Sequence, residues 1–453
     1  MPISKREQIL LTLQLSWPAI IAQLASIMMQ LIDAAMVGRL GSNQSAAIGL
    51  VASTTWLFNE LCIAVSTGFR VLVSQKIGAG QGKEARNLMK LGLLISTAFS
   101  TLVMVLGITI SGVLPRWLGA EEAIWKDASI YFFVFSLFLP VTETIHLAAG
   151  QLRASGNMRT PSLWMMLMCL LDVVFNAVLI FPTGTYHIGT VAVPGFDLGV
   201  LGAALGTALA HLVAALALLS HLLLRSPELK LRREERFSFC GKQLRQSLRI
   251  SLPVVAESVT LASARVMTTA IVAPLGTVAI AANSFGITAE SICYMPAYGV
   301  YHAASTLVGQ SIGAKRKETY QLGWLAVLLG MAMLCVTGTL LYLLAPWMME
   351  FLSTDPAVVE LGTQVLRIEA FAEPLYGAMI VCGGVFQGAG KTLASTILNF
   401  TTMWGVRVPL SALLAPRYGL HGVWFAMAFQ LGLGGLLYLM RLWSKRWLPK
   451  DGK

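Results

Sequence analysis

The sequence predicts an all-α integral membrane protein with twelve transmembrane helices in two six-helix lobes, related by a pseudo-two-fold axis normal to the membrane. Three observations support this prediction: the composition, the placement of basic residues and an internal repeat. Of the 453 residues, 56% are hydrophobic and only 12% are charged, whereas about 25% charged residues is typical of soluble domains. The net charge of +11 lies in the gaps between apolar runs. It therefore indicates membrane orientation, and we expect no nucleic acid partner.

Apolar runs bounded by charge, glycine or proline define the predicted spans. They cover residues 14–38, 46–75, 88–114, 123–150, 160–182, 198–224, 246–273, 278–311, 320–346, 357–387, 392–415 and 419–442. About 20 apolar residues are enough to cross a bilayer, so the longer runs imply helices that tilt or extend beyond it. The second span is interrupted by Glu60 and Arg70, and the eighth by Glu290.

Lysine and arginine residues alternate between the two sides of these spans. Connections on one side carry 25 of them, and those on the other side carry 4, namely Arg39, Arg116, Lys126 and Arg417. Under the positive-inside rule, we expect a multi-pass protein of the plasma (inner) membrane with both termini in the cytoplasm. The first apolar run is too long for a signal peptide, so we expect it to remain as the first helix.

The chain also repeats itself. MVGRLG at Met36–Gly41 aligns with IVAPLG at Ile271–Gly276, and LVSQKIGA at Leu72–Ala79 aligns with LVGQSIGA at Leu307–Ala314, both at an offset of 235 residues. Two halves of six spans each share one orientation, as in transporters built from parallel repeats.

The repeat predicts three parts of the chain. These are an N-terminal lobe at residues 1–224, a cytoplasmic linker at 225–245 and a C-terminal lobe at 246–453. Ligand sites of transporters commonly lie at the interface between repeats, so we expect a central cleft between the lobes.

Asp33 is the only ionisable residue between Pro18 and Gly38. A carboxylate at membrane depth costs at least ~2.5 kcal/mol and usually faces a cavity or a partner. Asp33 precedes Arg39 by six residues, about 9 Å at the helical rise, which places it in the outer third of its span. We interpret it as functional; the alternative is that it lies close enough to the helix end to reach water.

Asp172 and Asn176 form a second polar group, four residues apart and therefore on one helix face. With Asp33 and Thr207, which are predicted at a similar depth, they offer two carboxylates, an amide and a hydroxyl. Such a set binds a hard cation through oxygen ligands or exchanges protons. The alternative is that Asp172 and Asn176 only bond neighbouring helices, as polar residues do in bundles.

Candidate residues of the substrate path are Met28, Met29, Glu290, Tyr294 and Arg407. Methionines suit an adaptable binding chamber, although a methionine stripe is more often plain packing. The charged residues inside the second-half spans are of both signs: Glu257, Arg265, Glu290, Arg367, Glu369, Glu373 and Arg407. We interpret most of them as pairs that neutralise each other.

Signatures of enzymes, resident metals and cofactors are absent from the sequence. GVFQGAGKT at Gly384–Thr392 resembles a P-loop, but Val385 stands where the first glycine is required, and the segment follows a helix. The six histidines are scattered with no HExxH pattern, and the six cysteines with no CxxC spacing. We therefore expect no enzyme, with any uphill transport driven by an H+ or Na+ gradient.

The motifs together resemble the multidrug and toxic compound extrusion (MATE) family, from Leu15 to Arg441. The resemblance rests on LSWPAI followed by IDAAMVGRLG, on LVSQKIGAGQGKEA, RASGNMRTP and LGVLGAALGTALA, and on AESICYMP followed by LVGQSIGA and FQGAGKT. It implies a secondary active multidrug efflux transporter whose two lobes alternate between outward and inward states. Such proteins export amphipathic organic cations by antiport with H+ or Na+.

The resemblance also implies roles for single residues. Asp33 matches the first-helix acid of the family, and Thr207 matches the helix-six threonine of its cation site. Asp172 and Asn176 match the polar pair in helix five, but the family pair is Asn with Asn, or Asn followed by Asp, so the order here leaves the ligand roles open. The helix-seven and helix-ten acids of the sodium-coupled branch fall at Leu261 and Tyr376, respectively. These departures favour coupling in the N-terminal lobe.

Two other functions compete with efflux of cations. A lipid-linked oligosaccharide flippase of the same superfamily is the alternative transporter, but such proteins usually show fourteen spans. A membrane-embedded enzyme is a different class, and the sequence shows no nucleophile or metal constellation for it. We expect a monomer whose partners are the lipid bilayer and small organic cations.

The charge bias makes a testable prediction about topology. Cys240 lies in the basic linker, so an impermeant thiol reagent should leave it unmodified in intact cells and modify it after permeabilisation. Labelling followed by mass spectrometry measures this directly. Modification of Cys240 from outside would refute the predicted orientation.

Overall fold

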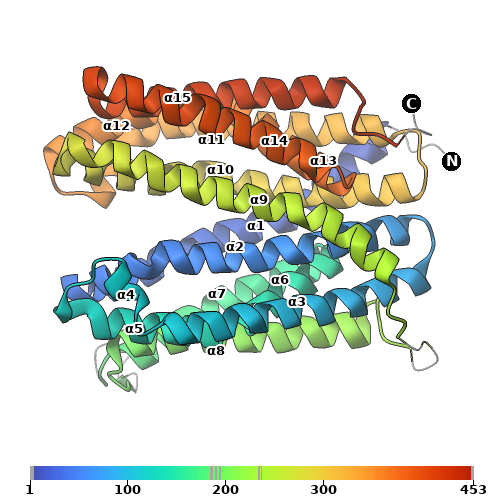
Figure 1. The fold of residues 1–453 in the computed structure, drawn as a ribbon, viewed down its shortest axis with the longest axis horizontal. Coiled ribbons are helices and arrows are strands. Elements are labelled where there is room, and N and C mark those ends of the chain that lie inside the picture. Colours follow the sequence, from blue (N-terminus) through green and yellow to red (C-terminus); the bar gives the residue numbers. More distant parts are fainter. Residues whose placement is uncertain are drawn as a thin grey trace. The chain divides into compact units, whose positions relative to one another are not determined.

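The computed structural model describes residues 5–183, 187–188, 191–192, 195–232, 235 and 237–449. Nearly all of these residues lie in helices, which confirms the predicted all-α fold (Figure 1). The first half holds α1 (Lys5–Gly38), α2 (Ser42–Gly78), α3 (Gly82–Ile110), α4 (Leu114–Trp117), α5 (Glu122–Leu137), α6 (Leu139–Ala154), α7 (Arg159–Ile180) and α8 (Gly199–Ser220). The second half holds α9 (Gly241–Val272), α10 (Thr277–Gly313), α11 (Thr319–Leu352), α12 (Pro356–Ala370), α13 (Glu373–Gly388), α14 (Thr392–Thr402) and α15 (Val408–Trp443).

The chain folds into two compact units. Unit 1 comprises the chain to Leu24, Ser74–Gly80 and the chain from Arg249 onward, and unit 2 comprises Ala25–Val73 and Gln81–Leu248. Helix α1 thus contributes residues to both units. The two six-helix lobes at residues 1–224 and 246–453 stay a prediction. Parts of the predicted linker, at 233, 234 and 236, and the chain ends at 1–4 and 450–453 lie outside the described residues.

Within the described residues, 8 helical segments are long and apolar enough to cross a membrane, or 9 if α5 and α6, bent by 45°, form one span. The counted segment Thr392–Trp443 has 52 residues, about 78 Å at the helical rise, which is far more than the ~30 Å hydrocarbon core needs. Gly419 interrupts this segment with φ 57° and ψ −140°, at the boundary predicted between two spans. An integral membrane fold is confirmed, and the count of twelve stays a prediction.

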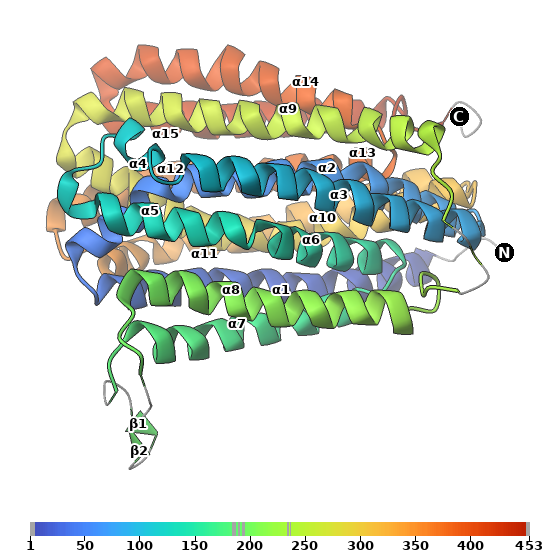
Figure 2. The same ribbon diagram turned by 60° about the horizontal axis from the view of Figure 1, so that its bottom comes forward.

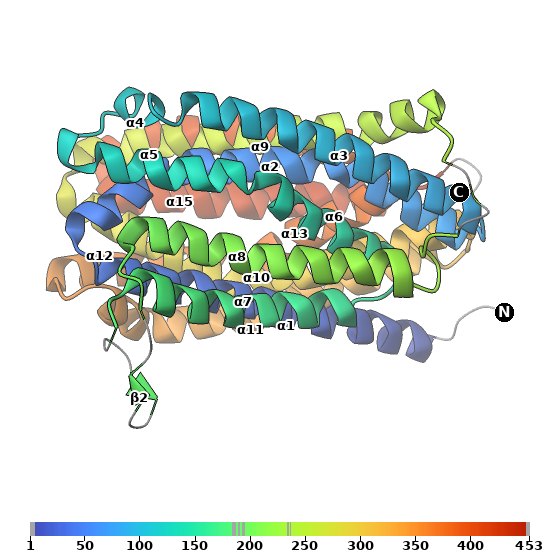
Figure 3. The same ribbon diagram turned by 90° about the horizontal axis from the view of Figure 1, so that it is seen from below.

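In unit 2, α7 and α8 lie side by side, joined by a segment that contains the antiparallel hairpin of β1 (His187–Ile188) and β2 (Val191–Ala192). Figures 2 and 3 show the hairpin projecting to the side of α7 and α8, at one end of these two helices. The face of α8 toward its neighbours is built from small residues, including Gly202, Ala203, Gly206 and Ala210, all of which are buried. Small side chains let two helix backbones approach closely, which is how membrane helices pack.

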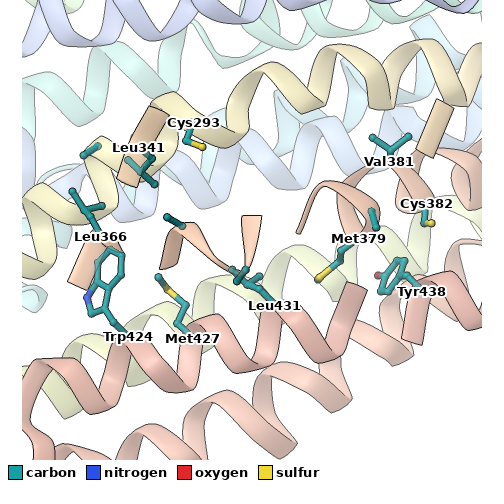
Figure 4. Packing of buried hydrophobic residues seen from close by; sticks show 14 of the residues in the cluster. Cys293, Leu341, Leu366, Met379, Val381, Cys382, Trp424, Met427, Leu431 and Tyr438 are labelled. Carbon is teal, nitrogen blue, oxygen red and sulfur yellow. The ribbon is translucent and has the colours of Figure 1, made fainter. Parts of the chain in front are cut away.

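In unit 1, the apolar core lies among α10, α11, α12, α13 and α15. Trp424, Met427 and Leu431 recur along α15 at spacings of three and four residues, so they share one face, and Figure 4 shows Trp424 beside Leu366 of α12. The indole Nε1 of Trp424 donates to Oδ1 of Asn283 at 3.0 Å. The largest side chain of the core therefore buries its polar group with a partner.

The segment after η1 (His221–Arg225) is docked onto α3 within unit 2. Arg86 holds Glu235 through Nε to Oε2 at 2.7 Å and Nη2 to Oε1 at 2.5 Å, and its Nη1 donates to the carbonyl of Glu228 at 3.1 Å. Asn87 exchanges two hydrogen bonds with the backbone of Ser238, at 2.8 and 3.0 Å. The hydrogen bonds from Arg86 lower the pKa of Glu235 below its ordinary value. Glu228, Glu235 and Ser238 of this segment are therefore bonded to α3.

This ion pair predicts a pH-dependent stability. Because the pKa of Glu235 is lower in the folded protein than in the unfolded chain, the pair stabilises the fold above about pH 4 and stops doing so as acid protonates Glu235. An ion pair near the surface contributes up to about 1 kcal/mol, so Glu235→Gln should lower the Tm at neutral pH by about 2 °C. Thermal melts of purified protein across pH measure the difference.

The matched control for this experiment is Glu360→Gln, because Glu360 is exposed and accepts from Gln364 through Oε1, an oxygen that glutamine keeps. That variant should keep the wild-type Tm at neutral pH. A gap between wild type and Glu235→Gln that persists unchanged into acid would contradict a contribution from the charge pair.

Candidate functional site

The structure brings together three of the four residues predicted for cation coupling. The side-chain nitrogen of Asn176 donates to Oδ1 of Asp33 at 3.0 Å and to Oδ2 of Asp172 at 3.1 Å. Asp172 and Asn176 lie on the buried face of α7, with 0% and 1% of their surface exposed, and Asp33 reaches them from α1, half-buried. One amide therefore joins two carboxylates from helices far apart in the sequence, and we call these three residues the acid pair site.

Helix α8 closes the acid pair site on its other side through Gly206. A Cβ atom at this position would overlap Oδ1 of Asn176, so only glycine lets α8 approach the amide. We did not predict a role for Gly206, although Gly202 and Gly206 follow the four-residue spacing of small residues typical of close helix contacts. Thr207, the fourth predicted residue, is half-buried on α8, next to Gly206 in the chain.

Two oxygen atoms of the acid pair site have no hydrogen-bond partner in the part of the chain that the structure describes. They are Oδ1 of Asp172 and Oδ1 of Asn176, and both are buried. Tyr131 of α5 lies close enough to interact electrostatically with both acids. Buried polar atoms are nearly always paired, so the open oxygens and the two neighbouring carboxylates mark a place that favours a proton or a small cation.

The predicted substrate-path residues of the first span lie on the same helix as Asp33. Met28 is 56% exposed, and Met29 is half-buried. Both belong to the part of α1 that is in unit 2. Their role in a substrate path stays a prediction.

The predicted substrate-path residues of the second half lie in a buried polar cluster of unit 1. Glu290 of α10 interacts electrostatically with Arg407 and Arg265, and Glu369 of α12 interacts with Glu290 and with Glu373 of α13. The three glutamates are between 0% and 6% exposed. Glu290 and its two arginines carry opposite charges, and each arginine lowers the cost of burying the glutamate. That these residues form pairs stays a prediction.

Two charges of the second half lie in other surroundings. Asn399 donates to the carboxylate of Glu257. The guanidinium of Arg367 lies over the ring of Tyr342, 5.2 Å from its centroid. These contacts give Glu257 and Arg367 structural partners of their own.

Tyr294 belongs to a row of aromatic rings in unit 1. Its ring centroid lies 5.3 Å from that of Tyr376 and 6.3 Å from that of Tyr298, and Tyr298 lies 5.8 Å from Tyr301. The sequence analysis did not predict the other three tyrosines as a group. The spacing of Tyr294, Tyr298 and Tyr301, four and then three residues, already placed them on one helix face.

Within the described residues, no group of three or more His, Cys, Asp or Glu side chains is arranged to hold a metal ion. The acid pair site has two acidic side chains and one amide.

The profile of the MatE family matches residues 18–178 and 253–413. The first match begins at 18 and the second at 253, so they lie 235 residues apart, which is the offset of the internal repeat. The profile therefore recognises each half of the chain separately. This result confirms the resemblance that the motifs carry.

Curated relatives cover almost the whole chain. A probable multidrug resistance protein NorM from Thermotoga maritima is 25% identical over 445 residues, which cover 96% of this chain and 93% of the relative. An FAD transporter from Shewanella oneidensis is 24% identical over 424 residues, which cover 92% of this chain and 90% of the relative.

Solved structures show the same fold at low sequence identity. One is the outward-facing form of a multidrug resistance MATE family transporter, with a TM-score of 0.89, 20% identity and coverage of 98% of this chain and 100% of the other. Another is a MOP superfamily transporter from Pyrococcus furiosus, described by the reverse polarity of its binding pocket, with a TM-score of 0.89, 19% identity and 98% coverage of each chain. Since the family profile matches both halves and the fold agrees over nearly the full length, the chain belongs to the MatE family of membrane transporters.

Proposed function

We propose that this transporter is a secondary active multidrug exporter of the plasma membrane, which exchanges amphipathic organic cations for H+. The relatives named as probable multidrug resistance proteins support export of drugs. The observation that carries the proposal is the acid pair site, where Asn176 bonds Asp33 and Asp172 at 3.0 and 3.1 Å. Two carboxylates this close in a poorly hydrated interior repel each other strongly, so a proton or another cation stabilises the pair.

The direction of the Asn176 amide favours H+ over Na+ as the coupling ion. An amide carries two N–H donors and one carbonyl acceptor. The nitrogen of Asn176 faces both carboxylates, and its oxygen faces Gly206. A hard metal cation binds oxygen ligands, so Na+ between the acids requires the amide to turn over, whereas a proton requires no such change.

Exchange follows from competition for the same negative charge. A substrate cation and a coupling cation cannot both be held at low cost near the acid pair site, because like charges repel strongly where water is scarce. Protonation of Asp33 or Asp172 removes the charge that favours the substrate. We propose that α1 then repacks, bending at Pro18, where the helix lacks one backbone hydrogen bond. Helix α1 suits this role because it contributes to both units.

An anionic substrate is the second candidate, since Arg265 and Arg407 lie in the polar cluster of unit 1 and one relative is an FAD transporter. Glu290, Glu369 and Glu373 lie in the same cluster. The acids outnumber the two arginines, so the cluster favours a cation. Export of an anionic dye in preference to a cationic dye would support the second candidate instead.

Asp33→Asn tests the role of the acid pair site. An amide has nearly the volume of the acid but neither titrates nor carries charge, so export of ethidium driven by a pH gradient should fall at least about tenfold, while the protein remains folded. The measurement is dye transport in proteoliposomes with an imposed gradient.

The matched control is Asp197→Asn. Asp197 is exposed and has φ 55°, a backbone conformation that asparagine adopts readily, so this variant should export normally. Undiminished pH-driven export by Asp33→Asn would contradict the proposal.

Coupling also predicts how substrate affinity depends on pH. By linkage, the proton weakens substrate binding by the same factor as substrate weakens proton binding. Affinity for a cationic dye should therefore fall as the pH is lowered, by about 5-fold to 150-fold in total, and the dependence should flatten in Asp33→Asn. Fluorescence titration of detergent-purified protein gives both curves, and equal slopes for wild type and variant would place the coupling elsewhere, with Glu290 the next residue to test.

A further inference from the structure

Unit 2 contains a second set of buried and half-buried polar side chains that the acid pair site does not use. Thr142, Glu143 and His146 lie on α6, Arg70 on α2 and His211 on α8. On α6 they recur at spacings of three and four residues and so share one face of the helix. We call these five residues the polar row.

The polar row begins next to the acid pair site. His211 lies four residues after Thr207 on α8, so the two side chains point to the same side, and it is close enough to Asp172 to interact electrostatically. Nδ1 of His211 lies 3.1 Å from Oγ1 of Thr142. His146, one turn further along α6, interacts electrostatically with His211.

The polar row ends at Glu143 and Arg70. Glu143 is 2% exposed. Ser66 of α2 lies beside its carboxylate, and neither carboxylate oxygen makes a hydrogen bond of ordinary geometry with the residues that the structure describes. The stem of Arg70 rests on Gly150, where a Cβ atom would overlap its Cδ, and Nη2 of Arg70 donates to Oγ1 of Thr67 at 2.6 Å. Arg70 interacts electrostatically with Glu143.

The order of these residues along their helices gives the row a direction. Asp172 lies in the half of α7 that leads to Ile180. Helix α6 follows the 45° bend after α5 and runs from Leu139 to Ala154, so Glu143 and His146 lie in its first half. Arg70 is eight residues from the end of α2 at Gly78, about 12 Å. The charge bias predicts these ends of α2 and α6 to be cytoplasmic. The polar row thus leads from the acid pair site toward the cytoplasm.

We propose that His211, His146 and Glu143 form a proton path that connects the acid pair site with the cytoplasmic end of unit 2. This inference rests on the proposed exchange for H+. Each imidazole takes a proton on one ring nitrogen and releases one from the other, and Glu143 carries the proton on a carboxylate oxygen. One proton is passed on and Glu143 returns to its starting state, while each imidazole is left as its other tautomer, which a turn of the ring restores before the next transfer.

The surroundings of the row select a proton over a metal cation. Arg70 of α2 and Arg153 of α6 carry fixed positive charge near His146, which repels Na+, while imidazole and carboxylate groups still exchange protons. The other titratable neighbour of Glu143 is Cys62 of α2. The charged residues of α3, which packs on α6, lie in its first three turns, between Lys83 and Lys90.

Glu143→Gln tests the path in proteoliposomes that contain a pH-sensitive dye. Exchange of labelled for unlabelled ethidium needs substrate binding and movement of the transporter but no net proton transfer. We expect this exchange to stay within about twofold of wild type, and substrate-linked proton flux to fall at least about tenfold, as expected when a proton-transfer group is removed. Glu143→Asp keeps a carboxylate and should restore part of the flux.

The matched control is Glu257→Gln, the same replacement of a buried glutamate in unit 1, where Asn399 holds the side chain. It should leave proton flux at the wild-type level. If Glu143→Gln fails to fold, His146→Gln and His211→Gln take its place, with the same loss of flux expected.

Each outcome decides between the two proposals. Wild-type protein that exchanges ethidium without moving protons would refute H+ coupling and the path with it. Wild-type proton flux that persists in Glu143→Gln would refute the path alone. A parallel loss of exchange and flux would show that Glu143 only holds α2, α6 and α8 together, and would also overturn the path.

Discussion

The arrangement of unit 2 depends on one amide placed between two carboxylates. Asn176 uses both of its N–H donors on Asp33 and Asp172, and hydrogen bonds to charged groups are among the stronger ones in proteins. This contact ties α1 to α7 at a place where Asp172 is fully buried and Asp33 is half-buried. This contact requires glycine at position 206, because the Cβ atom of any other residue there would overlap the side-chain oxygen of Asn176. The packing of three helices and the chemistry of the site therefore depend on the same few atoms.

The two halves match the same family profile, but their buried charged residues have different neighbours. In unit 1, Glu290 is set against Arg265 and Arg407, so opposite charges offset one another. In unit 2, two like charges share one neutral donor. The two profile matches, residues 18–178 and 253–413, begin 235 residues apart. Arg407 lies the same number of residues after Asp172, so it occupies the corresponding position in the second half. At this position the repeat therefore carries an acid in one half and a base in the other, so Asp172 has a second acid as its neighbour, whereas Arg407 has acids of opposite charge.

Much of the fold follows from local pattern, because a helix that crosses lipid must bond its own backbone and present apolar side chains. Asp33 stands out by the cost of a charge at depth, and Asp172 and Asn176 pair on one face by their spacing of four. The sequence did not reveal the meeting of His211 with Thr142, since residues on α8 and α6 lie far apart in the chain and each histidine alone is as consistent with a satisfied core residue. The same is true of Tyr376, which joins the row of Tyr294 from another helix.

The sequence by itself determined the apolar spans, the repeat, the family and the residues able to carry charge, because hydropathy and motif spacing are properties of neighbouring residues. The tertiary structure decided which of those residues meet. It turned the nitrogen of Asn176 toward the acids and its oxygen toward Gly206. It also placed Glu143 beside Arg70 and Ser66. Such contacts arise from the packing of helix faces that are distant in sequence, and no periodicity within one helix encodes which partner the other helix supplies.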